Sequence, residues 1–167
     1  HKKGLFLSGA AYTPLSKNFY FSLEISYSQK GSLQKAFIDN DTNNGYYKLK
    51  LDYADIPIMI VYDDKGKARF ATGMSYGRLV NYQEWENKKK LNYKKNETPY
   101  NKEDIDWIGG FEFRITKNIW AGLRYSYSVS KIRTRIYERV KRDQYNNFLT
   151  IRMVYVFNPK AYNNKIS

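Results

Sequence analysis

The stretch "NFYFSLEISYSQ" (residues 18–29) alternates between apolar and polar side chains along its whole length. One side carries Phe19, Phe21, Leu23, Ile25 and Tyr27, and the other carries Tyr20, Ser22, Glu24, Ser26 and Ser28. A period of two residues predicts a β-strand with one apolar face. The alternation alone leaves open whether that face meets the core of a soluble protein or lipid.

The same period of two dominates the rest of the chain. We expect seven strands, at about residues 4–12, 18–29, 46–62, 68–85, 104–116, 119–131 and 146–157. No segment has the 3.6-residue period of an amphipathic helix, and no apolar run is long enough for a transmembrane helix. The sequence therefore predicts an all-β protein.

The connections between these segments alternate in length. Short turns with Pro, Gly or Asn occupy residues 13–17, 63–67 and 116–118, whereas long polar loops occupy about 30–45, 86–103 and 132–145. An outer-membrane barrel has short periplasmic turns and long external loops, and a soluble meander has no physical reason to separate them. The pattern favours an up-and-down antiparallel transmembrane β-barrel in the outer membrane.

The polar faces of the strands contain mainly Ser, Gly, Glu and Arg, where a solvated exterior would be expected to carry Lys. That composition suits a narrow barrel interior, in which small residues make room and opposite charges pair.

In segment 46–62 the apolar side chains move from the odd-numbered to the even-numbered positions, and we expect a bulge near Ala54–Pro57 that turns Asp55 inward. In segment 68–85 the alternation does not decide which set of side chains forms the apolar face.

Composition narrows the classes of function. The 167 residues suit one domain, the mean hydropathy is -0.73, and there is no Cys for a disulfide or a thiolate metal site. The only His is His1, which excludes His-based catalysis inside a fold. The net charge of +13 favours anionic partners such as nucleic acid or phosphate-bearing lipid. No helix-turn-helix, RNP-type aromatic motif or zinc ligand set supports nucleic acid.

Strand parity predicts a further strand. Bacterial single-chain barrels have an even number of strands, and seven is odd. With external long loops, segment 4–12 runs toward the periplasm, so an upward strand should precede it. We therefore expect eight strands in the mature protein, with the first missing before residue 1. We expect residues 1–157 to form the barrel domain and residues 158–167 a short periplasmic tail.

Two motifs stand in order along the chain: "E-x-x-Y-S-Q-K-G-S" at Glu24–Ser32 and "L-x-Y-x-x-I-P" at Leu51–Pro57. They resemble the PorT-like outer-membrane β-barrel family of Bacteroidota. The order of motifs agrees over nearly the whole chain. The resemblance implies an eight-stranded barrel whose first strand precedes the segment matching residues 1–12. PorT itself is associated with type IX protein secretion, which also supports gliding, but membership alone does not assign that role.

The first candidate site is a network of charges that point into the lumen. Its members are Glu24, Asp55, Glu112, Arg114, Arg124 and Arg152. We interpret them as structural ion pairs that fill the barrel, because an eight-stranded interior has room for side chains only. A proton or ion path is the alternative. Carboxylates such as Glu112 and Asp106 lack a nucleophile, a base and a cleft, so we expect no catalytic residue, cofactor or metal.

The second candidate site is a set of external basic loops for lipopolysaccharide phosphates or a partner protein. Its members are Lys88, Lys89, Lys90, Lys94, Lys95, Lys131, Arg133, Arg135 and Arg139. Arginine forks suit phosphate, although part of this charge can equally be a solvated rim. Because Ile132, Thr134 and Ile136 alternate with arginines, we expect a hairpin that rises beyond the membrane.

The third candidate set is a pair of aromatic girdles near the strand ends, as membrane barrels carry. Its members are Phe19, Tyr27, Tyr62, Trp85, Trp107, Tyr125, Tyr127 and Phe157. Aromatic residues are common in any strand, so their position at both ends is the informative feature.

Together these patterns predict a non-enzymatic accessory subunit of an outer-membrane complex, with type IX secretion or gliding machinery as a candidate. Outer-membrane lipid, lipopolysaccharide and other outer-membrane or periplasmic proteins are the expected partners. The alternatives are a soluble lipocalin-like barrel, which predicts an apolar lumen and a polar exterior, a lipopolysaccharide-binding barrel without a protein partner, and an outer-membrane enzyme.

Overall fold

The computed structural model describes residues 3–34, 47–86, 89–91, 100–137 and 140–157. Within them the chain forms strands and connecting segments, and no helix is long and apolar enough to cross a membrane. The strands are β1 (Phe6–Pro14), β2 (Phe19–Lys30), β3 (Leu33–Gln34), β4 (Tyr47–Asp64), β5 (Ala68–Glu86), β6 (Lys89–Leu91), β7 (Glu103–Arg114), β8 (Ile119–Ser128), β9 (Arg133–Tyr137), β10 (Val140–Gln144) and β11 (Asn147–Tyr155).

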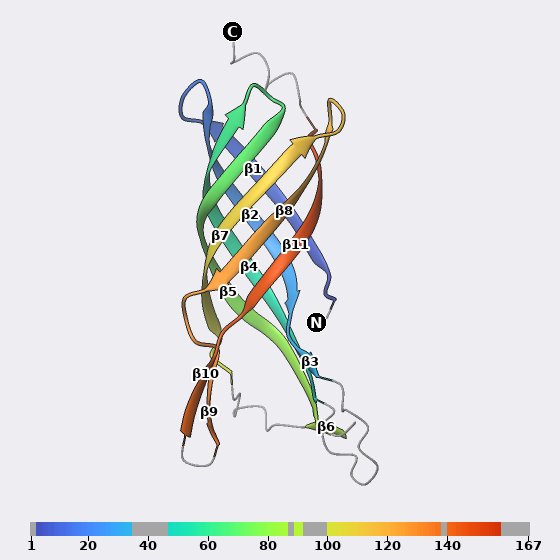
Figure 1. The fold of residues 1–167 in the computed structure, drawn as a ribbon, viewed down its shortest axis with the longest axis vertical. Helices are drawn as coiled ribbons and strands as arrows, with labels where there is room; N and C mark the ends of the chain where they lie inside the picture. The colour runs from blue at the N-terminus through green and yellow to red at the C-terminus, as the bar shows by residue number, and fades with distance from the viewer. Residues whose placement is uncertain (1–2, 35–46, 87–88, 92–99, 138–139, 158–167) are drawn as a thin grey trace.

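Seven long strands form one curled antiparallel sheet in the order β1-β2-β4-β5-β7-β8-β11 (Figure 1). Each long strand pairs with the next long strand along the chain, which is the up-and-down topology that the loop lengths predict. The three tight turns lie at one end of the sheet and the long connections at the other (Figure 1). The predicted fold class is therefore confirmed, and residues 158–167 lie outside the described residues.

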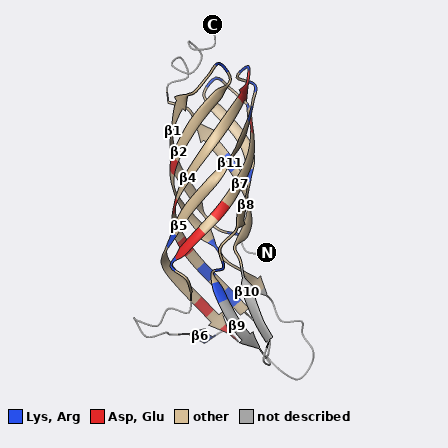
Figure 2. Ribbon diagram, turned by 90° about the vertical axis from the view of Figure 1, so that its left-hand side faces the viewer, with Lys and Arg blue, Asp and Glu red and all other residues tan. Residues whose placement is uncertain are grey.

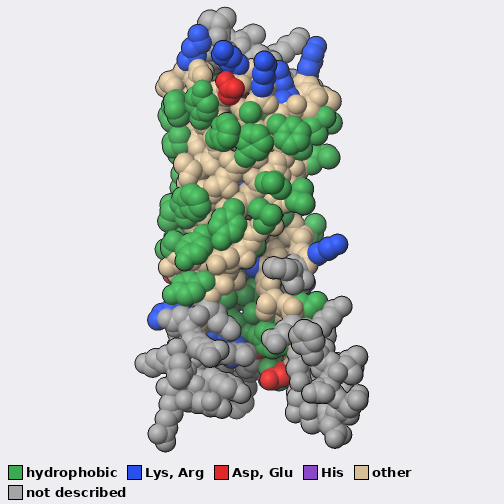
Figure 3. Space-filling view, in the orientation of Figure 1, with side chains coloured by type: hydrophobic (Ala, Val, Ile, Leu, Met, Phe, Trp, Pro, Cys, Tyr) green, Lys and Arg blue, Asp and Glu red, His purple; other side chains and the backbone are tan. Residues whose placement is uncertain are grey.

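The wall is apolar outside and polar inside. Charged positions recur along the strands in Figure 2, and those in the middle of the wall, such as Glu24 and Arg124, are buried. The outer surface shows a broad band of apolar and aromatic side chains (Figure 3). Leu23, Ile58 and Phe111 are among those exposed there. This is the reverse of a lipocalin-like barrel, so that alternative is wrong, and the apolar face of "NFYFSLEISYSQ" is directed outward to lipid.

Two strands continue well past the others at the long-loop end. β4 and β5 stay paired out to Tyr47 and Glu86, and the short strands β3 and β6 pair with this extension. Beside it, β9 and β10 form the hairpin expected from the alternating arginines (Figure 1). The external part of the protein is therefore a structured continuation of the barrel wall.

The bulge expected near Ala54–Pro57 lies elsewhere. The register of β4 and β5 shifts between Asp52 and Tyr53, where Val80 of β5 is the extra residue. On β4 the odd-numbered side chains stay inward from the extension into the barrel, so Asp55 is buried without any change of phase. The apolar residues that precede Asp55 on this face fill an external core rather than facing lipid.

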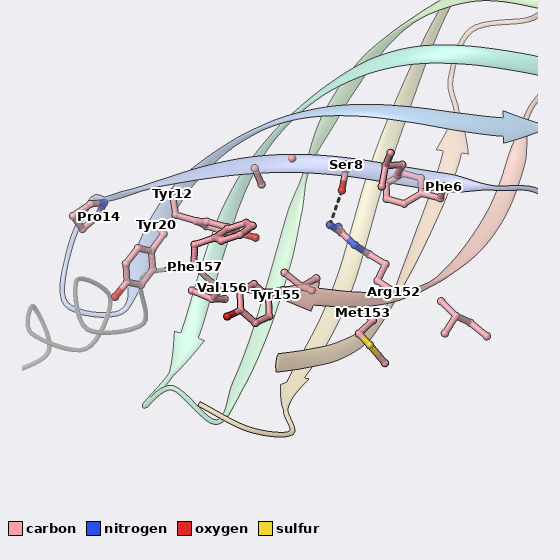
Figure 4. A pocket seen from close by; sticks show the side chains of 15 residues that line it. Phe6, Ser8, Tyr12, Pro14, Tyr20, Arg152, Met153, Tyr155, Val156 and Phe157 are labelled. Atoms are coloured by element: carbon pink, nitrogen blue, oxygen red, sulfur yellow. Dashed lines mark hydrogen bonds between the residues drawn. The ribbon is translucent and has the colours of Figure 1, made fainter. Parts of the chain in front are cut away.

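A seam separates β1 from β11, because no hydrogen-bonded pairing joins the two ends of the sheet. A groove of about 690 Å³ runs between them, lined by both strands (Figure 4). A second groove of about 750 Å³ lies at the long-loop end, between β2 and the start of β11. In Figure 4 the Arg152 guanidinium reaches across the seam and donates a hydrogen bond to the Ser8 hydroxyl at 3.4 Å.

The outer face of β11, at the edge of the sheet, is more exposed than that of the strand it pairs with. Ile151 and Met153 are 83% and 78% exposed, whereas Leu123 and Tyr125 on the paired strand β8 are 48% and 43% exposed. Since seven strands alternate in direction, β1 and β11 run the same way, and one strand antiparallel to both would close the wall. The eighth strand, expected from the even strand number of such barrels, stays a prediction.

Cysteine cross-linking tests for a strand in the seam. An interposed strand would hold β1 and β11 about 10 Å apart, twice the spacing of neighbouring strands and beyond the reach of a disulfide. In native membranes we therefore expect Leu7→Cys/Met153→Cys to form no direct disulfide, but to be joined by a bismaleimide of matching length. The control pair Leu23→Cys/Ile58→Cys sits on directly paired positions and should oxidise readily. Efficient disulfide formation across the seam would show that β1 and β11 pair directly.

Candidate functional site: a lumen filled by ion pairs

The middle of the lumen is occupied by one carboxylate and two guanidinium groups. Both oxygens of Glu24, on β2, accept hydrogen bonds of 2.9 Å from Arg124, on β8. Arg152, on β11, donates a further bond of 3.3 Å to the same carboxylate and lies 3.8 Å from Glu112, on β7. Strand alternation positions all four side chains, because each stands on the even-numbered, inward face of its strand.

A second cluster fills the lumen toward the long-loop end. The ammonium of Lys30 lies 2.6 Å from Asp106, 3.2 Å from Asp104 and 3.5 Å from Asp55, and all four side chains are buried. Ser128 and Ser28 donate hydrogen bonds to Asp104 and Asp55, respectively. Burying carboxylates singly would be costly, so one shared cation and several hydroxyl donors hold this cluster together.

A third cluster fills the lumen at the tight-turn end. Arg69 pairs with Asp63 at 3.1 Å, and its guanidinium carbon lies 3.8 Å from the centre of the Trp120 ring, a cation–π distance. Tyr12 lies on another side of the guanidinium at 5.5 Å. The backbone N–H of Gly66 donates to Asp63, which ties the β4–β5 turn to the interior. With this cluster, paired charges lie at three levels of the lumen.

Four of the six residues proposed for the lumen network lie in these clusters as buried side chains: Glu24, Asp55, Arg124 and Arg152. Glu112 is partly buried and joins through Arg152. Arg114 makes no ion pair in these clusters, because it is the last residue of β7 and its side chain is exposed beside the tight turn. Its guanidinium carbon lies 5.9 Å from the centre of the Trp120 ring, at the edge of the third cluster. Alternation gives Arg114 an inward phase, but a strand end leaves a long side chain free to reach solvent.

A small core caps the barrel beyond the second cluster. Leu49, Leu51 and Tyr53 of β4 pack with two loop residues, Tyr100 and Ile132. Tyr53 also connects the cap to the barrel, since the Lys30 ammonium lies 4.6 Å from its ring centre. The residues that precede Asp55 on β4 therefore bury their apolar surface outside the membrane.

The fully buried carboxylate of Glu84 ties the cap together. It accepts hydrogen bonds from Tyr47 at 2.9 Å and Tyr100 at 2.8 Å, and from Arg133 at 3.3 Å. Burial is the main factor that raises the pKa of the Tyr100 phenol above its ordinary value, so this hydroxyl remains a donor. Arg133 therefore has an internal structural partner, although its position in a basic loop predicts an external one.

The remaining proposed basic residues are only partly described. Lys89, Lys90 and Lys131 are exposed at the long-loop end. The others lie outside the described residues or have side chains that are not described: Lys88, Lys94, Lys95, Arg135 and Arg139. The expected external basic surface thus rests on three described lysines.

The aromatic residues proposed for girdles divide into two groups. Those at the outer surface of the barrel wall are Phe19, Tyr27, Tyr62, Trp107, Tyr125, Tyr127 and Phe157. Trp85 is different, because it stands on the β5 extension, where it pairs with Lys48 and Lys90 and stacks on the Lys48 ammonium at 4.6 Å. Trp85 therefore belongs to the external part and not to a girdle on the barrel wall.

An antiparallel wall with an apolar exterior and a lumen filled by paired charges is the geometry of a small membrane barrel. Residues 1–133 match a family model described as an outer membrane protein beta-barrel domain. The chain belongs to this outer membrane β-barrel domain family. No curated protein and no solved structure matches the chain. Family membership indicates the outer membrane as the location of this barrel.

Sequence reasoning missed several charged residues of the barrel. The inward positions of β2 and β7 are even-numbered, and Lys30 and Asp104 are among them. Alternation along the strand alone could therefore have placed both side chains in the lumen. Arg69 lies on the segment whose phase was ambiguous. Alternation could not have placed Glu84 inside. The bulge at Val80 shifts the inward positions of β5 from odd-numbered to even-numbered residues.

Replacing Glu24 tests the central ion pair. Glu24→Gln keeps the shape of the side chain but leaves Arg124 and Arg152 without their shared buried carboxylate. Breaking a buried pair from one side costs about 3–5 kcal/mol, so we expect the unfolding midpoint in detergent to fall markedly. The exposed carboxylate Glu103 offers a matched control, and Glu103→Gln should unfold as the wild type does. Equal stability of the two variants would contradict a structural role for Glu24.

Replacing Tyr100 tests the cap separately. Tyr100→Ala removes apolar packing and one donor to Glu84, so amide hydrogen exchange should accelerate at Leu49–Leu51 of the extension. Exchange at Ile58–Ile60, within the barrel wall, should remain slow and serves as the internal control. Unchanged exchange in the extension would show that Tyr100 does not stabilise it.

Proposed function

We propose that this barrel is a non-enzymatic structural or accessory subunit of an outer-membrane protein complex. The observation that carries the proposal is the set of ion pairs that cross the lumen, among them Glu24 with Arg124 and Lys30 with Asp106. A barrel that is packed with side chains offers its outer wall, its external extensions and its turns for interaction. Within the described ranges, no group of acidic residues or histidine is arranged to hold a metal ion.

The external extensions are the best candidates for contact with a partner protein. The β4–β5 ribbon and the β9–β10 hairpin project beyond the barrel, and the Glu84–Arg133 pair holds them against each other. Rigid projecting strands lose little conformational entropy on binding, which favours specific association. The sequence resemblance to the PorT-like family makes type IX secretion or gliding machinery the first candidate complex.

A second candidate function is the binding of lipopolysaccharide without a protein partner. It is favoured by the exposed lysines at the external end, Lys89, Lys90 and Lys131. Lipopolysaccharide phosphates lie at this surface of the outer membrane, and cations there would bind them. Both functions use the external end, but they predict different molecules in a purified sample.

Purification from native membranes in a mild detergent, followed by mass spectrometry, distinguishes the two functions. We expect the tagged full chain to recover specific outer-membrane or periplasmic proteins in fixed proportion. A matched variant replaces residues 133–144 with an Asn-Gly turn, which shortens the hairpin and keeps β8 and β11 connected. This variant should lose those proteins while its barrel still shows heat-modifiable migration on gels. Recovery of the chain with lipopolysaccharide but no protein would contradict the accessory-subunit proposal.

A further inference from the structure

The tight-turn end of the barrel carries a ring of exposed cations. Figure 3 shows basic side chains along this rim on the face in view, directly beyond the apolar band. The described residues that form the ring, here named the turn collar, are Lys17, Lys65, Lys67, Arg114 and Lys117. They come from all three tight turns, so the ring extends around the rim instead of clustering in one loop.

The charge of the turn collar is not balanced locally. Among the described residues, none of the ion pairs found involves a collar cation, and Asp64 is the one exposed carboxylate in the tight turns. The other carboxylate of that turn, Asp63, faces inward and is paired with Arg69. The rim is therefore strongly electropositive.

One collar cation is held in an unfavourable backbone conformation. Lys65 has φ of 50° and is followed by Gly66 with φ of 66°, at the centre of the turn closed by the Lys67 N–H and the Asp64 carbonyl. A turn with two such residues favours Asn-Gly, and a lysine there is uncommon. Turn formation therefore does not explain the choice of Lys65, whereas a role for its charge would.

The turn collar lies next to a belt of aromatic side chains. Phe19 packs against Tyr62 with ring centres 5.3 Å apart, and Tyr155 packs against Phe157 at 5.1 Å. Aromatic belts mark the level at which a bilayer changes from hydrocarbon to headgroups. Long basic side chains just beyond that level keep their stems near the apolar region and their charges among the headgroups. The collar is thus placed at the depth of lipid phosphates.

We propose that the turn collar binds anionic phospholipid headgroups of the periplasmic leaflet. This surface is distinct from the external lysines, which face the opposite leaflet, and its function does not depend on the protein complex proposed above. Attraction of this kind weakens as salt screens it, and it anchors the barrel at a fixed depth and tilt. An acidic periplasmic protein is the competing occupant.

Native mass spectrometry of the full chain in detergent tests the proposal, with phosphatidylglycerol and phosphatidylcholine titrated as separate probes. We expect phosphatidylglycerol to bind more tightly than phosphatidylcholine, in a manner that salt weakens and inorganic phosphate does not abolish. Replacing all five collar cations with Gln should reduce the apparent affinity for phosphatidylglycerol at least about tenfold. The matched control replaces five exposed cations at the other end with Gln: Lys3, Arg78, Lys89, Lys90 and Lys102.

A smaller variant protects the test against misfolding. Lys65→Asn together with Lys117→Asn removes two charges with a residue that suits turns, so the barrel should fold normally and still lose affinity several-fold. The proposal is overturned if the collar and control variants lose affinity equally, or if the collar variants bind phosphatidylglycerol as the wild type does. Loss of a co-purifying periplasmic protein with unchanged lipid binding would also overturn it and assign the collar to that protein.

Discussion

The bidentate pair between Glu24 and Arg124 is the interaction on which the barrel depends. It joins β2 to β8 directly across the lumen, between residues that are 100 positions apart in the sequence. A carboxylate can be buried at that point only because two guanidinium groups converge on it, and they converge only when the sheet is curled. The pair therefore links the inward position of Glu24 in "NFYFSLEISYSQ" to the curl of the sheet, which is open between β1 and β11.

A lumen occupied in this way moves function to the outside of the barrel. Three charged clusters cross the lumen, so the proposed recognition uses the extensions, the outer wall and the turns. The two ends are chemically different. The long-loop end is a built structure around Glu84, whereas the turn end is a ring of cations at headgroup depth, so each end suits a different partner.

Alternation and loop length predicted most of this fold from the sequence, because both follow directly from strand geometry in a membrane. Asp55 was expected in the interior only because of a bulge near Ala54–Pro57, and that bulge lies elsewhere. Alternation along the strands placed Glu24, Arg124 and Arg152 in the interior. It failed for Arg114, where the strand ends, and for Glu84, where the bulge at Val80 reverses the faces. The cap could not be predicted, because it depends on contacts between β4 and loops distant in the sequence. The partner stays a proposal, because side-chain alternation and strand pairing describe the barrel wall and do not say which molecule binds it.

The conductance of the purified full-length barrel in a planar lipid bilayer tests the central claim most directly. A lumen that is closed by the Glu24, Lys30 and Arg69 clusters predicts insertion without ohmic current steps. Insertion should be verified independently by protease protection of the reconstituted protein. Stable current steps of uniform size would contradict the account, because they would show a continuous water-filled path where the structure places paired side chains.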